Sequence, residues 1–326
     1  MANDVRSAPS VLSGLLLAIA VAVSFATNSA LARIAYEAGS NALSVLTVRT
    51  SVALVALLVL LTVQRVPYVL PAGRAVKALA LGLVLASYSY GLLGSFQYVP
   101  LAVGIVTFYT YPLLTAFASA ATGRERITVV TLAALAAAFV GLTLVVDLRG
   151  GGFDPVGIAH AFAAAIFFTA LLLLSDRVRG DGDSRPITLH MLLTGVICYG
   201  GACVLTGLFR LPQTPLGWAG FLGNPVFYSF SIICLFVAVR RIGPVRAALI
   251  LNVEPVASAV LGYLLLDQTL TPLQMAGIAM VVGAVLSLRL SPGMLVRPRV
   301  SPMLWPVTSL VTGCLLMLGS AVAWLW

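Results

Sequence analysis

The sequence predicts an all-α polytopic membrane protein: a core of ten helices in two inverted five-helix repeats, plus one extra C-terminal transmembrane helix. Three observations predict this fold class. Eleven apolar runs divide the chain, most of them near the roughly 20 residues that a helix needs to cross a bilayer. Sixty per cent of the 326 residues are hydrophobic and 9% are charged, whereas a soluble domain carries about 25% charged residues. Finally, Lys and Arg are concentrated in every second gap between the runs.

Each apolar run predicts one membrane-spanning helix. The gaps between the runs are too short to fold as a soluble domain. The runs cover residues 11–33, 42–63, 78–96, 100–121, 127–146, 156–175, 187–209, 216–238, 243–265, 271–288 and 304–326. The first run follows Arg6 and ends near an Ala-Leu-Ala sequence, as a cleaved signal peptide would. It is longer than a typical signal-peptide core, so we expect it to stay as the first helix.

The basic residues predict the orientation. Of the 19 Lys and Arg residues, 15 lie in the N-terminal tail, in every second gap after it or, for Arg246, just past the end of such a gap: Arg6, Arg65, Arg74, Lys77, Arg124, Arg126, Arg177, Arg179, Arg185, Arg240, Arg241, Arg246, Arg289, Arg297 and Arg299. Cytoplasmic loops are enriched in Lys and Arg. The pattern therefore predicts a multi-pass protein of the bacterial inner membrane with a cytoplasmic N-terminus. It also accounts for the formal net charge of +9 without any nucleic-acid partner.

The chain divides into two repeats of opposite orientation. Residues 1–147 form the predicted first repeat, 148–155 a linker and 156–290 the second repeat. Five is odd, so the second copy must lie upside down, and the basic bias of each loop is the reverse of that of its counterpart. A shift of 143 positions pairs Pro112 with Pro255 and Thr128 with Thr271. Residues 291–303 form a basic, Pro-rich linker to the extra helix at 304–326.

Inverted repeats are typical of secondary transporters, whose substrate site lies near the membrane midplane where helices are interrupted. Proline removes an amide donor and kinks a helix. Pro112 and Pro255 lie at matching mid-span places, so we expect them to mark such interruptions. A packing role is the alternative for each proline alone.

Polar and aromatic side chains within the runs predict a substrate cavity, because small-molecule sites combine apolar walls with a few placed polar groups. The candidates are Ser24, Asn28, Ser87, Tyr88, Tyr90, Tyr109, Tyr111, Phe168, Tyr228, Asn252 and Glu254. Glu254 is the single carboxylate deep within a predicted span. It could bind a substrate amine or carry a coupling proton; alternatively, it caps the backbone freed by Pro255. Arg49 lies nearer the outer end of its span, where it can snorkel. A structural role is favoured there, with a substrate carboxylate as the alternative.

A resemblance adds to this interpretation. The stretch 243–290, with GPVRAALILNVEPVASAVLGYLLLDQTLTPLQ, and the stretch from Tyr111-Pro112 to Thr128 resemble the repeat unit of EamA-type transporters of the drug/metabolite transporter superfamily. Amino-acid exporters of the YddG type are the nearest resemblance within it. The resemblance covers residues 11–290. It implies ten helices, a central cavity and transport of small metabolites, amino acids above all, by alternating access.

Other functions find little support. The sequence has no G-x-x-x-x-G-K-[ST] loop for ATP and no paired in-span acids or H-E-x-x-H, so we expect no enzyme activity, no cofactor and no metal. The two histidines and four cysteines have no metal-ligand spacing. The alternatives are a carrier of other metabolites or drug-like cations and, in another class, a membrane receptor or scaffold. The expected partners are a small-molecule substrate and lipid, and the eleventh helix leaves a homo-oligomer open.

Overall fold

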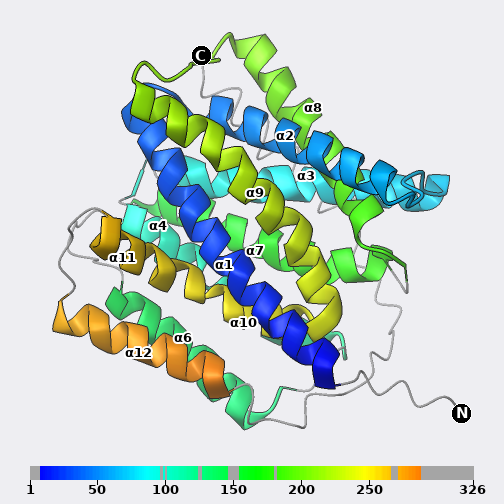
Figure 1. Ribbon diagram of the computed structural model, residues 1–326. Helices are drawn as coiled ribbons and strands as arrows, with labels where there is room; N and C mark the ends of the chain where they lie inside the picture. The colour runs from blue at the N-terminus through cyan, green and yellow to red at the C-terminus, as the bar shows by residue number, and fades with distance from the viewer. Residues whose placement is uncertain are drawn as a thin grey trace, which may run out of the picture.

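The fold was obtained as a computed structural model that describes residues 8–95, 98–99, 101–123, 127–145, 154–179, 182–265 and 271–287. Within these ranges the chain forms twelve α-helices (Figure 1). They are α1 (Ala8–Glu37), α2 (Ala42–Val63), α3 (Ala72–Ser95), α4 (Leu101–Phe108), α5 (Tyr111–Ala121), α6 (Val129–Val145), α7 (Pro155–Arg179), α8 (Arg185–Thr206), α9 (Pro215–Ile242), α10 (Pro244–Leu251), α11 (Val253–Leu265) and α12 (Pro272–Ser287). The expected linker at 291–303 and extra helix at 304–326 lie outside the described residues, as does most of the linker at 148–155.

The twelve helices correspond to ten crossings. Eight helical segments are long and apolar enough to span a membrane, and two of these combine a pair of short helices: α4 with α5, and α10 with α11. The shorter apolar helices α6 and α12 supply the remaining two. The predicted all-α, ten-helix fold is therefore confirmed. Some helices extend beyond the predicted apolar runs. Helix α1, for example, continues to Glu37, whose carboxylate forms an ion pair at 2.9 Å with Arg33, one turn earlier in the same helix. The last turn of such a helix is polar, so a prediction from hydrophobicity alone ends the helix too early.

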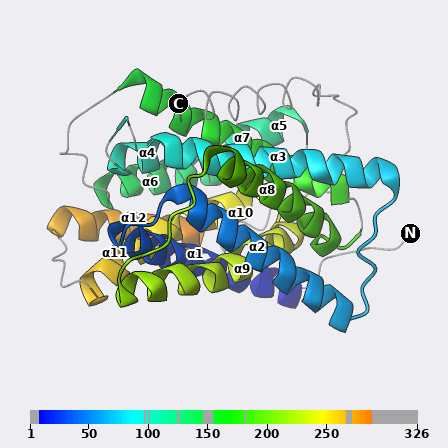
Figure 2. The same cartoon turned by 90° about the horizontal axis from the view of Figure 1, so that it is seen from above.

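Packing between helices follows the inverted repeat. The first and eighth crossings, α1 and α9, pack along their lengths, and so do their repeat counterparts, the sixth and third crossings, α7 and α3. In the view from above, α3 and α7 lie in one layer, with α1 and α9 in the other (Figure 2). The fifth and tenth crossings, α6 and α12, pair with each other along one edge of the bundle (Figure 1). A pseudo-two-fold relation between the halves explains why these contacts recur.

The same helix cap starts α6 and α12. Thr128 precedes α6 and its Oγ1 accepts a hydrogen bond from Thr131 N at 3.2 Å. Thr271 precedes α12 and accepts from Gln274 N at 3.2 Å, while Gln274 Oε1 accepts from Thr271 N at 2.9 Å. The second arrangement is a capping box, which satisfies two amide donors that a helix start leaves free. The two threonines paired by the sequence shift therefore do the same structural work.

Helices α6 and α12 approach closely at two glycines. A Cβ built on Gly277 would lie 2.5 Å from the Gly141 carbonyl oxygen, and one built on Gly141 would lie 2.8 Å from the Gly277 carbonyl oxygen. Small residues let membrane helices approach backbone to backbone. Only glycine fits at this crossing without moving a helix.

The two ends of the bundle are tied differently. At the end that carries Asn41, the Asn41 amide donates to Leu208 O at 2.8 Å, Ser40 Oγ donates to Arg210 O at 2.9 Å, and Arg210 N donates to Ser44 Oγ at 2.7 Å. These bonds join the α1–α2 connection to the α8–α9 connection.

At the opposite end, Arg185 links the start of α8 to the residue that follows α2. Its guanidinium donates to Gln64 Oε1 and to both oxygens of Asp183. Burial raises the pKa of Asp183, but the hydrogen bonds and charge of Arg185 outweigh burial and hold that pKa below its usual value. A polar cluster of Arg185, Asp183 and Gln64 therefore joins the two helices at this end of the bundle.

Candidate functional site

Two broken helices, one from each half, meet at the centre of the bundle. The fourth crossing breaks between α4 and α5, at Tyr109 and Thr110, and the ninth breaks between α10 and α11, at Asn252. Pro112 and Pro255 lie in the first turn after each break. Asn252 N bonds to Leu249 O at 3.1 Å and so leaves the Ala248 carbonyl without the partner that a continuous helix would supply.

A residue of the other half satisfies this carbonyl. The Tyr111 hydroxyl donates to Ala248 O at 3.4 Å, and the Asn252 side-chain amide donates to Ala248 O at 3.3 Å and to Leu249 O at 3.0 Å. Buried carbonyl groups in a membrane need such partners because no water is available to them. Asn252 therefore serves as a local cap, and Tyr111 connects the two breaks.

Aromatic rings surround this junction. Tyr88 of α3 lies 4.7 Å from Phe168 of α7, and Tyr111 lies 4.7 Å from Phe168 with its ring perpendicular. Phe108 contacts Tyr88, Phe168, Tyr109 and Tyr111, at centroid distances of 5.1 to 6.2 Å. We refer to these five rings as the aromatic cluster. Pairs at such distances are stabilising, so the cluster is a rigid wall built from four helical segments and one break.

Glu254, in the first turn of α11, faces the cluster. The Tyr109 hydroxyl hydrogen-bonds to its carboxyl group. Glu254 is also close enough to Tyr88, Tyr111 and Arg49 for electrostatic interaction. Its carboxyl group thus interacts with a side chain of the opposite repeat.

Arg49 of α2 also turns toward the interior. Its guanidinium carbon lies 4.3 Å from the centroid of the Tyr228 ring on α9. Its Nε is buried and has no hydrogen-bond partner. Snorkelling to the outer surface, as expected from the position of Arg49 in its run, is not what the structure shows. The ring of Tyr228 offers the guanidinium a cation–π contact inside the bundle, and the side chain takes it.

Four predicted cavity residues lie elsewhere or are used by the helices themselves. Ser24 donates to Phe227 O at 3.0 Å, and Asn28 accepts from the Asn224 amide at 2.7 Å, so both join α1 to α9. Ser87 donates to Leu83 O within its own helix at 2.9 Å. Tyr90 is close enough to Tyr98 for electrostatic interaction.

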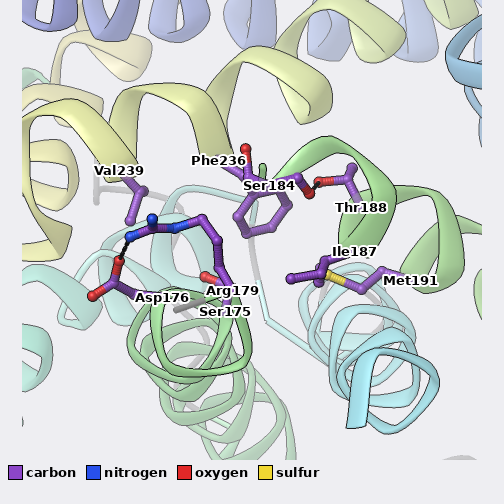
Figure 3. Close-up of a pocket in the computed structure, with 9 residues that line it drawn as sticks. All are labelled: Ser175, Asp176, Arg179, Ser184, Ile187, Thr188, Met191, Phe236 and Val239. Carbon is purple, nitrogen blue, oxygen red and sulfur yellow. Dashed lines mark hydrogen bonds and ion pairs between the residues drawn. The ribbon is translucent and has the colours of Figure 1, made fainter. Parts of the chain in front are cut away.

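The predicted cavity is closed in this conformation. The exposed fraction is 7% for Tyr88, 5% for Tyr109, 1% for Tyr111 and 2% for Asn252. A small cavity of about 10 Å³ does occur between α7, α8 and α9, beside the Asp176–Arg179 ion pair (Figure 3). It has room for about one water molecule and lies roughly 10 Å along α7 from Phe168, at 1.5 Å per residue. It is therefore separate from the aromatic cluster.

Comparison with known proteins settles the family. The model of the EamA-like transporter family matches residues 12–147 and again residues 155–290. The chain belongs to the EamA-like transporter family. This EamA protein is thus a multi-pass membrane transporter and not an enzyme.

Two relatives and one solved structure extend the comparison. The threonine/homoserine exporter RhtA of Escherichia coli strain K12 is 27% identical over 206 residues, which is 62% of this chain and 67% of the relative. RhtA of Salmonella typhimurium strain LT2 is 28% identical over the same lengths. A crystal structure described only as "Crystal structure of protein" superposes with a TM-score of 0.68 at 20% identity, covering 85% of this chain and 98% of that one. The last likeness supports the fold alone.

Sequence reasoning missed Phe108, which carries no polar signal although it directly precedes the break and contacts the other four rings of the cluster. Thr169, next to Phe168 in the sequence, donates to Tyr111 O at 3.2 Å and so holds the second half of the broken crossing. Among the described residues, no three His, Cys, Asp or Glu side chains gather as metal ligands.

Proposed function

We propose that this EamA protein exports amino acids across the bacterial inner membrane by alternating access around the aromatic cluster. The observation that carries the proposal is the meeting of two broken helices from inverted halves at Tyr111, Ala248 and Glu254. Transporter sites form at such places, since freed backbone groups and polar side chains can serve a substrate there. The RhtA relatives, named as threonine/homoserine exporters, support amino acids as the substrate class.

The closed cluster fits one state of such a cycle. Phe168 of the cluster lies near the middle of α7, and Tyr228, which contacts Arg49, lies near the middle of α9, so both groups are near the midplane of the bundle. Opening toward either side would require the rings to separate, and the pseudo-two-fold packing supplies two equivalent ways to do this. Within this proposal the N-terminus is cytoplasmic, which places the Asn41 end outside and the Arg185 end inside.

Transport by purified protein tests the proposal. The protein is reconstituted in liposomes, and uptake of labelled threonine, homoserine and a panel of neutral and aromatic amino acids is measured with and without a pH gradient. We expect saturable uptake that unlabelled amino acid competes for. Absence of uptake for every member, in sealed vesicles shown to hold folded protein, would refute amino-acid transport.

The role of Glu254 is tested in the same assay. Because the carboxyl group contacts the opposite repeat through Tyr109, we expect Glu254→Gln to insert and fold like the wild type but to lose most transport. If the variant still transports but no longer responds to the pH gradient, Glu254 carries the coupling proton. Wild-type transport by folded Glu254→Gln would make the residue structural.

A further inference from the structure

One face of the Arg49 guanidinium lies over the Tyr228 ring, and its buried Nε–H donor has no hydrogen-bond partner. A guanidinium is planar and carries its five N–H donors in that plane. Its contact with the Tyr228 ring, at 4.3 Å, is of the kind that uses the charge above a ring face. Nε has no acceptor, and in the described part of the chain no carboxylate forms an ion pair with Arg49. The guanidinium is therefore positioned by Tyr228 but left open to another partner.

An unpaired charged donor within a membrane span is costly and marks a functional position by default. Removing a partner from a buried charged donor costs more than the hydrogen bond itself contributes. Tyr228 offsets part of the cost of the charge but accepts nothing from Nε. A guanidinium presents two parallel N–H bonds that match the two oxygens of a carboxylate, so the missing partner is best described as a carboxylate.

A second ionisable side chain, that of Glu254, lies near Arg49. Glu254 interacts electrostatically with Arg49, yet the two side chains form no ion pair between the described residues. Tyr88 interacts with both of them. The two groups are therefore near enough to interact but are not paired with each other, and a ligand that carries both charges would contact each of them once the closed cavity opens.

We propose that Arg49 binds the carboxylate of a zwitterionic substrate while Glu254 binds its ammonium group, with the aromatic cluster beside the substrate side chain. This inference rests on the proposed function and adds the substrate determinant: both α-groups must be free and charged. An organic cation would meet the repulsion of Arg49, and a simple anion would meet that of Glu254. The paired groups therefore select against both singly charged classes.

The test compares an amino acid with two derivatives that each lack one charge. Binding of labelled L-threonine to the purified protein is measured in competition with unlabelled L-threonine, L-threonine amide and N-acetyl-L-threonine, so that a variant that transports poorly can still be compared. If the panel above shows a better-transported amino acid, that amino acid and its amide and N-acetyl forms replace threonine. The wild type should bind the free amino acid at least tenfold better than either derivative.

Each variant should erase one of these preferences and keep the other. Arg49→Gln should bring the acid-over-amide ratio close to one, and Glu254→Gln should bring the acid-over-N-acetyl ratio close to one. Arg33→Gln, which removes an exposed arginine paired with Glu37, is the matched control and should change neither ratio. Arg49→Lys keeps the charge without the two-pronged donor and should give an intermediate acid-over-amide ratio.

The outcomes separate this inference from the proposed function. If the wild type takes up no amino acid, the proposed function fails. If it takes up amino acids but accepts the amide and the N-acetyl form equally well, the zwitterion inference is overturned while the proposed function stands, and this result needs no variant to fold. Ratios in Arg49→Gln that match the wild type would overturn the assignment of Arg49.

Discussion

Replacing Gly277 with alanine tests the close crossing of α6 and α12. The new Cβ would lie 2.5 Å from Gly141 O and 2.9 Å from both Leu144 Cβ and Val145 N. Two of these three atoms are backbone, so the helices themselves must shift. Forcing an extra methyl into a filled space costs about 1–3 kcal/mol. Alanine recovers up to about 1 kcal/mol through its higher helix propensity.

A second glycine of the same helix supplies the control. A Cβ on Gly283 meets nothing within 4 Å, so Gly283→Ala gains helix propensity without the clash. The difference in unfolding free energy between the two alanine variants therefore isolates the contact, and we expect it to be about 1–3 kcal/mol in favour of Gly283→Ala. The measurement is thermal unfolding of each detergent-purified variant, followed by loss of the monodisperse peak. A Gly277→Ala protein as stable as Gly283→Ala would refute the close approach.

Three further predictions concern other parts of the molecule. Asn41 caps the start of α2, where its Oδ1 accepts a hydrogen bond from Ser44 N at 2.8 Å. Asn41→Ala should therefore lower stability by about 1–2 kcal/mol in thermal unfolding; Asn41→Asp, which keeps the cap, should lose less, and an equal loss would contradict the capping role. Tyr109→Phe should reduce amino-acid uptake by proteoliposomes about tenfold, the effect of one hydrogen bond to a charged group, and unchanged uptake would detach Tyr109 from the function of Glu254. Because Arg185 holds the pKa of Asp183 below its usual value, the pair stabilises the fold above the unfolded pKa of about 3.9 and loses this effect as pH falls through the lower folded pKa. The stability difference between wild type and Asp183→Asn should therefore be constant above about pH 5 and shrink below pH 4, and a difference independent of pH would contradict the assignment.

The fold could be predicted because a few properties of the sequence determine where helices cross a membrane and in which direction. Length and hydrophobicity fix the crossings, and the bias of Lys and Arg reveals the inversion between halves, even where sequence identity is sparse. The helix breaks near Pro112 and Pro255 also follow from covalent chemistry, since proline lacks an amide donor. Helix ends are less predictable: the polar turn between Arg33 and Glu37 continues α1 beyond its apolar run.

The site was less accessible to sequence reasoning because composition does not say where a side chain points. Tyr88 and Tyr90 look alike in the sequence, yet two residues apart on a helix they face different neighbours, and Tyr88 alone joins the aromatic cluster. The direction of Arg49 depended on Tyr228, which lies on another helix and in the other repeat. Asn28, which the sequence predicts as a cavity residue, accepts a hydrogen bond from the Asn224 amide of α9.

The carbonyl of Ala248 has two donors, and only one of them comes from the other half. If Tyr111 moves away from α10, the Asn252 amide, which belongs to the same half as Ala248, still donates to that oxygen. Separation at this point would therefore cost one hydrogen bond without stranding an acceptor in the dry interior. The junction can therefore open while the Ala248 carbonyl keeps a hydrogen-bond donor from its own half.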